Sequence, residues 1–245
     1  MLKTEISGIL VVDKPPGWTS HDVVQKIRNV LGGIKVGHTG TLDPDATGVL
    51  VLLIGNATKM AYLYENDDKR YRAEITFGQA TDTYDASGKI IATGDPTVVD
   101  RQRLEAVIQG FVGESEQLPP MYSAVKVQGK RLYQLARKGK TVERKPRKIV
   151  IRSIISDLSR FPRIVLDIVC SKGTYIRSIA HQLGEIVGCP SHLSSLRRTE
   201  SGTFSLEDAL DFLPFIESRG TLDVLDHIRP VSQSTRIVIR QDQQV

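Results

Sequence analysis

The sequence predicts an α+β fold, with a mixed and mostly antiparallel sheet flanked by helices. Two hydrophobic patterns recur along the 245 residues. Some runs alternate with period two, as strands do, and others place apolar residues three and four apart, as helices do. The two kinds of run do not follow one another in strict βαβ order, so a purely parallel sheet is not expected. The content of 40% hydrophobic and 25% charged residues is ordinary for a globular protein.

The expected strands are short apolar runs bounded by turn residues. The clearest is 69–77, where Tyr71, Ala73, Ile75 and Phe77 share one face and charged residues or threonine occupy the other. In chain order, the strands are expected at residues 8–12, 49–54, 69–77, 124–127, 148–158, 163–170 and 193–203.

The expected helices begin at capping residues and end at glycine. Thr19 or Ser20 can cap the first helix, and Thr174 and Ser205 can cap two later ones. Gly32 and Gly33 close the first helix. In chain order, the helices are expected at residues 20–31, 57–64, 99–111, 131–138, 175–186 and 206–215.

Residues 37–48, Gly-His-Thr-Gly-Thr-Leu-Asp-Pro-Asp-Ala-Thr-Gly, form the motif loop, the most informative stretch of the chain. Its glycines permit unusual backbone angles, and Pro44 pushes Asp43 toward an extended conformation. Apolar runs on both sides anchor the loop, so it presents His38, Asp43 and Asp45 from a rigid frame. The alternative is a polar turn that bonds only its own backbone. The glycine spacing matches neither a Rossmann nor a Walker phosphate loop.

The net charge of +5 hides a strong asymmetry. Residues 119–152 hold eleven Lys or Arg and a single acid, Glu143, so this basic segment carries +10 and the remainder carries −5. Tyr122 and Tyr133 lie among these cations. Lys and Arg bind phosphates and aromatic rings stack on bases, so the segment predicts a polyanionic partner. A merely solvated surface is the alternative, and such a surface usually carries both signs.

The motif loop resembles the signature G-H-T-G-T-L-D-P-x-A-T-G-x-L of the TruB family of bacterial tRNA pseudouridine-55 synthases. The likeness covers most of residues 8–205, through the segments 69–71, 117–126, 170–178 and 192–199. It implies the family's pseudouridine-synthase fold, with a catalytic domain at 1–213 and an RNA-gripping insertion at 119–152. Residues 214–245 would then be a short tail, a truncated or vestigial part of the RNA-binding PUA domain that most members carry.

The resemblance implies that Asp43 is the catalytic residue and that His38 helps to flip the target base. Isomerising uridine to pseudouridine breaks the N1–C1′ bond and joins C5 to C1′, so neither a cofactor nor a metal is required. One carboxylate suffices, either as the nucleophile or as a base at the sugar. The family pairs this aspartate with an arginine, here Arg177, whose charge opposes the rise in pKa that burial causes.

Further site residues follow from the same resemblance. Tyr71 would stack on the target base, Tyr175 would line the pocket, and Leu196 would pack near the site; without the resemblance, each tyrosine could equally be a core residue. A uridine within a folded RNA loop must be extruded before it reacts. The expected RNA contacts are Lys14, Lys69, Lys126, Lys130, Arg131 and Arg137.

The implied substrate is the T-arm of tRNA. The protein is expected to be a monomer without an obligate protein partner. A cytoplasmic location is expected because the sequence shows no signal peptide and no apolar run long enough to span a membrane. Cys170 and Cys189 lie in apolar surroundings and lack metal-ligand spacing, which favours a reducing compartment.

Three other functions deserve weight. Asp43, Asp45, Asp82 and Asp85 could together bind Mg²⁺ for phosphoryl chemistry, although Asp82 and Asp85 fit local turn capping. The chain could be a non-catalytic tRNA-binding or RNA-folding module that uses the basic segment alone. It could also be a guide-RNA-dependent relative, which would need an intact PUA domain.

Tyr84 and Gln182 depart from the family, whose members commonly have acids there.

Overall fold

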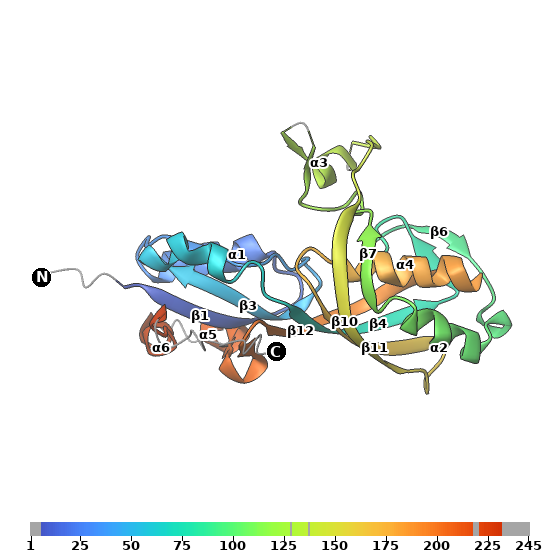
Figure 1. Ribbon diagram of the computed structural model, residues 1–245. Helices are drawn as coiled ribbons and strands as arrows, with labels where there is room; N and C mark the ends of the chain where they lie inside the picture. The colour runs from blue at the N-terminus through green and yellow to red at the C-terminus, as the bar shows by residue number, and fades with distance from the viewer. Residues whose placement is uncertain (1–5, 128, 137, 218–220, 232–245) are drawn as a thin grey trace, which may run out of the picture. The chain divides into compact units, whose positions relative to one another are not determined.

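A computed structural model describes residues 6–127, 129–136, 138–217 and 221–231 (Figure 1). The chain divides into two compact units. The first comprises Met1–Glu65 and Glu200–Val245, and the second comprises Asn66–Thr199. The first unit therefore contains the motif loop, and the second contains the basic segment.

The first unit is built on a small sheet whose centre is the pair β1 (Gly8–Lys14) and β3 (Thr47–Ile54). These strands are antiparallel, with Gly8 opposite Ile54 and Lys14 opposite Gly48. Two short strands extend the sheet: β2 (Val36–His38) is antiparallel to β3, and β14 (Leu210–Asp211) is parallel to β1. The other elements of the unit are α1 (Ser20–Val30), η1 (Gly55–Leu63), β13 (Phe204–Ser205), η3 (Leu206–Asp208), α5 (Phe212–Glu217) and α6 (Thr221–Asp226).

Helix α1 begins where the sequence predicts. The Thr19 hydroxyl accepts from the backbone N–H of Asp22, and the Asp22 carboxylate accepts from the backbone N–H of Thr19, which forms a capping box. The bonds from Thr19 hold the pKa of the Asp22 carboxyl below its usual value. Val23, Val24 and Ile27 are buried. In Figure 1, α1 lies on one side of β1 and β3, with α5 and α6 on the other.

The second unit is a larger antiparallel sheet covered on one face by helices. Its strands lie in the order β12–β4–β11–β10–β7. The alternation expected at 69–77 is confirmed, because Ala73, Ile75 and Phe77 are in the core while Arg72 pairs across the other face with Asp167 at 3.7 Å. The bounds are β4 (Lys69–Phe77), β7 (Gly113–Gln117), β10 (Arg147–Asp157), β11 (Arg163–Cys170) and β12 (Ser191–Ser201).

Two helices, α2 (Arg101–Gln109) and α4 (Ile176–Val187), share one hydrophobic core with these strands. They pack against each other, and the Arg103 guanidinium donates to the carbonyl of Ile186 at 3.2 Å. Smaller elements complete the unit: β5 (Gln79–Thr81), β6 (Ile90–Thr93), η2 (Pro96–Val98), β8 (Lys126–Val127), β9 (Lys130–Arg131) and α3 (Leu132–Ala136). The α+β class with a mixed, mostly antiparallel sheet is thereby confirmed.

Several elements differ from the sequence-based expectation. The helix expected at 57–64 is the 3₁₀ helix η1, which starts at Gly55 with a left-handed φ of 60°. The helix expected at 206–215 is divided into η3, β14 and α5, because Leu210 and Asp211 pair with β1. Strand β7 was missed, since its sequence Gly-Glu-Ser-Glu-Gln is exposed at its three central residues and carries no hydrophobic alternation. Among the described residues, no helix combines the length and the apolar character needed to cross a membrane.

Candidate active site

The first residues of the motif loop belong to strand β2, and its last residues belong to strand β3. The sequence predicts a loop from residue 37, but Gly37 and His38 belong to β2, where His38 lies opposite Leu52. The backbone N–H of Thr39 then donates to the carbonyl of Val51 at 3.1 Å. The free part of the loop is therefore shorter than expected, and both its ends are attached to the buried strand β3.

Asp43 is held from both sides by buried groups. Before it, the Ser20 hydroxyl accepts from the N–H of Leu42 at 2.8 Å and donates to the carbonyl of the same residue at 3.1 Å. After it, the carbonyl of Pro44 accepts from the Lys14 ammonium at 2.8 Å and from the N–H of Gly17 at 3.0 Å. The backbone around this half-buried carboxylate is therefore preorganised.

Lys14 has an internal role, which corrects the expectation that it contacts RNA. Its side chain is completely buried, and its ammonium also donates to the carbonyls of Pro15 at 2.8 Å and Trp18 at 2.7 Å. A buried ammonium needs such acceptors, because an unpaired buried charge is costly. With three carbonyls as partners and no exposed surface, Lys14 is a clamp on the motif loop and is unavailable to a phosphate.

Lys69 is likewise withdrawn from solvent, with 5% of its surface exposed. Burial disfavours its charged form and lowers the pKa of its ammonium, and the positive charge of Arg198 acts in the same direction. The ammonium donates to the carbonyl of Asp67. The expected RNA contact at Lys69 is therefore also corrected, because the cation is occupied inside the second unit.

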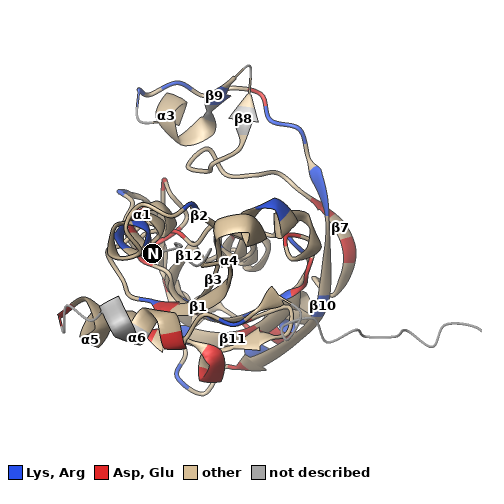
Figure 2. Ribbon diagram, turned by 90° about the vertical axis from the view of Figure 1, so that its left-hand side faces the viewer, with Lys and Arg blue, Asp and Glu red and all other residues tan. Residues whose placement is uncertain are grey.

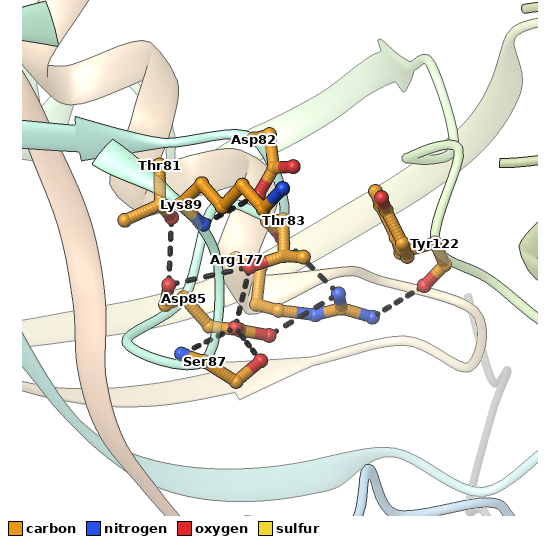
Figure 3. Close-up of polar contacts among 8 residues, drawn as sticks. All are labelled: Thr81, Asp82, Thr83, Asp85, Ser87, Lys89, Tyr122 and Arg177. Carbon is orange, nitrogen blue, oxygen red and sulfur yellow. Dashed lines mark hydrogen bonds and ion pairs between the residues drawn. The ribbon is translucent and has the colours of Figure 1, made fainter. Parts of the chain in front are cut away.

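A buried polar cluster of the second unit surrounds Arg177 (Figure 3). Arg177 lies in the first turn of α4 and is 4% exposed. Its guanidinium is 3.3 Å from the carboxylate of Asp85, and it donates to the carbonyls of Thr83 at 3.2 Å and Tyr122 at 3.0 Å. The arginine thus joins helix α4 to the turn at 81–88 and to the start of the basic segment.

Asp85 has two roles, of which the sequence analysis identified only one. As expected for turn capping, one oxygen accepts from the N–H of Ser87 at 3.1 Å and from the hydroxyls of Ser87 at 2.6 Å and Thr83 at 2.7 Å. The other oxygen faces Arg177. The carboxylate of Asp82, three residues earlier, accepts a local bond from the N–H of Lys89 at 2.8 Å (Figure 3). The sequence Thr-Asp-Thr-Tyr-Asp at 81–85 predicts a turn, but no local pattern predicts that Arg177 pairs with Asp85.

A second contact joins the same turn to α4. The ring of Tyr84 stacks on the ring of His181, with centroids 3.9 Å apart and planes inclined by 13°. His181 follows Arg177 by one helical turn, so the two side chains share a face of α4. Tyr84 has a left-handed φ of 67°, which a tyrosine rarely adopts. The stack therefore accompanies a backbone conformation that is itself unfavourable.

Tyr175 is positioned by a residue that the sequence analysis missed. The side-chain amide of Gln117, at the end of β7, accepts from the N–H of Tyr175 at 2.7 Å and donates to its carbonyl at 3.1 Å. Tyr175 is the N-cap of α4 and makes no side-chain cap. The expected cap at Thr174 is wrong, because its hydroxyl donates backwards to the carbonyl of Ser171 at 2.9 Å.

Tyr71 and Leu196 lie on neighbouring strands of the second unit. Tyr71 is on β4, opposite Ile168 of β11, and Leu196 is on β12 beside β4. Both are partly buried and pack against the same core cluster. The structure thus groups Tyr71 with Leu196, and Tyr175 with Arg177, in the second unit, while His38 and Asp43 belong to the first.

The basic segment is an excursion from a hairpin. Strands β7 and β10 are antiparallel, with Gln117 opposite Arg147, and the Arg144 guanidinium donates to the carbonyl of Pro119 at 2.9 Å. Between these ends lie the hairpin β8–β9 and helix α3, and Lys and Arg colour much of the excursion in Figure 2. Of the expected RNA contacts, Lys130 is exposed, Arg137 lies outside the described residues, and Lys126 and Arg131 are described only in their backbone.

The described residues contain no group of three or more His, Cys, Asp or Glu side chains arranged to hold a metal ion. Of the four aspartates considered for Mg²⁺, Asp82 and Asp85 have the turn and arginine partners given above.

Comparison with known proteins identifies close relatives. A family model described as TruB family pseudouridylate synthase (N terminal domain) matches residues 28–176. The chain is 51% identical over 209 residues to tRNA pseudouridine synthase B of Symbiobacterium thermophilum, covering 84% of this chain and 70% of that protein. It is 43% identical over 239 residues to tRNA pseudouridine synthase B of Opitutus terrae, covering 97% and 98% respectively.

Solved structures share the fold. The chain superposes with a TM-score of 0.68 and 29% identity on a chain of a Cbf5-Nop10-Gar1 complex, covering 91% of this chain and 60% of that one. It superposes with a TM-score of 0.65 and 26% identity on a chain of an H/ACA RNP bound to a substrate RNA containing 2′-deoxyuridine, covering 91% and 59%. The chain thus spans about 60% of the length of these solved chains.

Proposed function

The chain belongs to the TruB family of pseudouridylate synthases, and from that premise we propose that it isomerises uridine 55, in the T-arm loop of tRNA, to pseudouridine with Asp43 as the essential carboxylate. The relatives named above are tRNA pseudouridine synthases, which supports tRNA as the substrate. The enzyme acts as a cytoplasmic monomer in this proposal and needs no protein partner.

One observation carries the assignment of Asp43. Its loop is anchored at Leu42 by the buried Ser20 hydroxyl and at Pro44 by the buried Lys14 ammonium. A carboxylate that must meet one sugar carbon benefits from such a fixed backbone, because a positional error of about 1 Å costs much of the rate. Asp45, two residues later, is exposed and has no comparable anchor among the bonds of the described residues.

The reaction is balanced without any other reagent. The N1–C1′ bond of the uridine breaks, the base turns, and C5 joins C1′; the proton leaves C5 and N1 ends protonated. Asp43 acts either as the nucleophile at the sugar carbon or as a base at the sugar, and both roles need the ionised carboxylate. Arg177 is proposed as its cationic partner, His38 as the residue that helps to flip the base, and Tyr71 as the ring on which the base stacks.

The basic segment supports an RNA substrate. Its exposed Lys130, Lys138 and Lys140 lie on an excursion whose base is tied to the site by the bond from Arg177 to the carbonyl of Tyr122. In the proposal these cations bind phosphates of the T-arm, and the segment orders on the RNA because its charges repel one another without a polyanion.

The test is conversion of an unmodified tRNA transcript, followed by mapping of pseudouridine at single-nucleotide resolution. The proposal expects one modified position, in the T-arm loop, without added metal or cofactor and with full activity in EDTA. A chain that binds the transcript but leaves every uridine unchanged would instead be a tRNA-binding or RNA-folding module.

A further inference from the structure

We propose that a groove between α1 and β2 binds the phosphodiester backbone of the RNA beside the target uridine. The inference rests on the proposed function, because it takes tRNA as the substrate. It adds to that function a second anion-binding surface, in the first unit and separate from the basic segment. The groove occupies about 400 Å³, within the range of ~300–1,000 Å³ typical of ligand sites.

One wall of the groove is a single face of helix α1. It consists of His21, Val24, Gln25 and Arg28. These positions follow the i, i+3, i+4, i+7 spacing that places side chains in one row along a helix. Val24 closes the bottom of this row, being buried, while the three polar side chains are exposed. The wall therefore offers donors to solvent over an apolar floor.

The opposite wall is the chain that leads back from α1 into the motif loop. It runs from Gly33, whose φ of 90° favours glycine, through Lys35 to His38. The reversal after α1 is fixed by the bond from the N–H of Gly33 to the carbonyl of Arg28 at 2.9 Å. Lys35 is held in turn where its carbonyl accepts from the N–H of Gly55 at 2.8 Å. The two walls are therefore rigid relative to each other.

The charge of the lining has one sign. Arg28 and Lys35 are permanent cations, His21 and His38 add imidazoles, Gln25 adds an amide, and no carboxylate lines the groove. Among the described residues, neither the Arg28 nor the Lys35 side chain has an ion pair or hydrogen bond, and both are exposed. Two unneutralised cations match a phosphate, which offers only acceptors. The Gln25 amide donates one N–H to the side-chain oxygen of Asn29 at 3.1 Å and keeps a second one.

The groove is continuous with the motif loop. His38 lines it, and the loop toward Asp43 starts at the next residue. Ser20, the first residue of α1, holds Leu42 by two hydrogen bonds, so the helix that forms one wall also anchors the loop that carries Asp43. Because the groove shares helix α1 and His38 with the loop of Asp43, the ligand that we assign to it is a phosphate of the RNA beside the target nucleotide, rather than a free anion.

The test compares two double variants with equal loss of charge. Arg28→Gln with Lys35→Gln removes the groove cations, and Arg160→Gln with Arg163→Gln removes two exposed cations at the turn between β10 and β11. The dissociation constant of an unmodified tRNA transcript is measured from 0.05 to 0.3 M salt, about the range where phosphate contacts dominate, together with kcat and KM.

The groove variant is expected to bind tRNA at least about tenfold more weakly and to keep kcat within about twofold. The slope of log affinity against log salt should become less steep by about 1.4 to 1.8, the contribution of two phosphate contacts. The control variant should retain the affinity and the slope. A T-arm hairpin with one methylphosphonate linkage next to the target uridine should weaken wild-type binding but add nothing to the groove variant.

Unchanged affinity or an unchanged salt slope in the groove variant would overturn the inference. It would also be overturned if the methylphosphonate weakened binding by the groove variant as much as binding by the wild type. Failure of the proposed function looks different: the wild-type protein would bind the transcript and convert no uridine. The binding measurements still decide the role of the groove in that case, because they do not depend on turnover.

Discussion

Arg177 and Asp85 form a nearly buried ion pair at 3.3 Å between the start of α4 and the turn at 81–88 (Figure 3). Arg177 belongs to the helix, and Asp85 belongs to a turn whose backbone and hydroxyl groups it also binds. Because Arg177 also donates to the carbonyls of Thr83 and Tyr122, its position depends on two further segments. The surrounding fold therefore fixes the position of the Arg177 guanidinium, the cation that we propose assists the reaction.

Replacing Asp85 by Asn should destabilise the protein and slow it. Removing one partner of a buried pair leaves the other charge uncompensated, which costs about 3–5 kcal/mol in full burial. Since the Asp85 side chain is 21% exposed, we expect a loss of about 2–3 kcal/mol in the free energy of unfolding and a fall in kcat of at least about tenfold. Urea denaturation and single-turnover kinetics measure the two effects.

Asp82→Asn is the matched control on the same turn. Asp82 accepts the bond from the N–H of Lys89 and is in no ion pair within the described residues, so its replacement should cost less than about 1 kcal/mol. Equal damage from both substitutions would show that Asp85 matters only as a turn residue.

Asp43→Asn should abolish turnover while tRNA binding persists. The amide keeps the size of the side chain but loses both the charge and the nucleophile, so kcat should fall at least about a thousandfold, which equals about 4 kcal/mol of barrier. Asp45→Asn, two residues away and exposed, should keep most of the activity. Near-normal conversion by Asp43→Asn, measured by pseudouridine mapping, would exclude Asp43 as the sole catalytic carboxylate.

Lys14→Met should unfold more easily and turn over more slowly. The change leaves the carbonyls of Pro15, Trp18 and Pro44 without their charged donor. Since hydrogen bonds to charged groups contribute about 1.5–3 kcal/mol each, we expect a loss of about 3–5 kcal/mol after allowing for the apolar packing of methionine. Lys89→Met, at an exposed lysine, should be neutral. If Lys14→Met weakened tRNA binding at unchanged stability, Lys14 would be an RNA contact after all.

Neutralising Lys130, Lys138 and Lys140 to Gln should reduce tRNA affinity without unfolding the enzyme. All three are exposed on the excursion between β7 and β10. If each contacts one phosphate, the slope of log affinity against log salt should become less steep by about 2 to 3. The triple replacement of Lys89, Arg160 and Arg163, which are exposed elsewhere in the second unit, serves as the charge-matched control. An unchanged salt slope would remove the basic segment from the RNA interface.

Cys170 should make stability fall at alkaline pH. Burial raises the pKa of its thiol to about 11, whereas an unfolded thiol ionises near pH 8.5. Between these values the unfolded state releases a proton that the folded state keeps, so the free energy of unfolding decreases as pH rises. The expected loss approaches about 2–3 kcal/mol by pH 11 and should be absent from the curve of stability against pH of Cys170→Ala. Identical pH dependence of the two proteins in urea denaturation would contradict the buried-thiol account.

Features that depend only on neighbouring residues could be predicted from the sequence. The helix cap expected at Thr19 or Ser20, the alternation at 69–77 and the α+β class follow from local patterns, and the structure confirms them, with Thr19 as the cap. The motif loop and the basic segment were also recognisable as linear patterns, one of glycines and reactive side chains, the other of charge.

The contacts between polar groups from distant segments depend on how the whole chain folds. Gln117 holds Tyr175 across 58 residues, Arg177 reaches Thr83 across 94, and Lys14 reaches Pro44 across 30. Such pairs have no fixed spacing in the sequence, so no periodic pattern predicts them. Whether a lysine faces solvent or three carbonyls depends on the strands and loops that surround it after folding, because the cost of burying its charge is met by acceptors from distant segments.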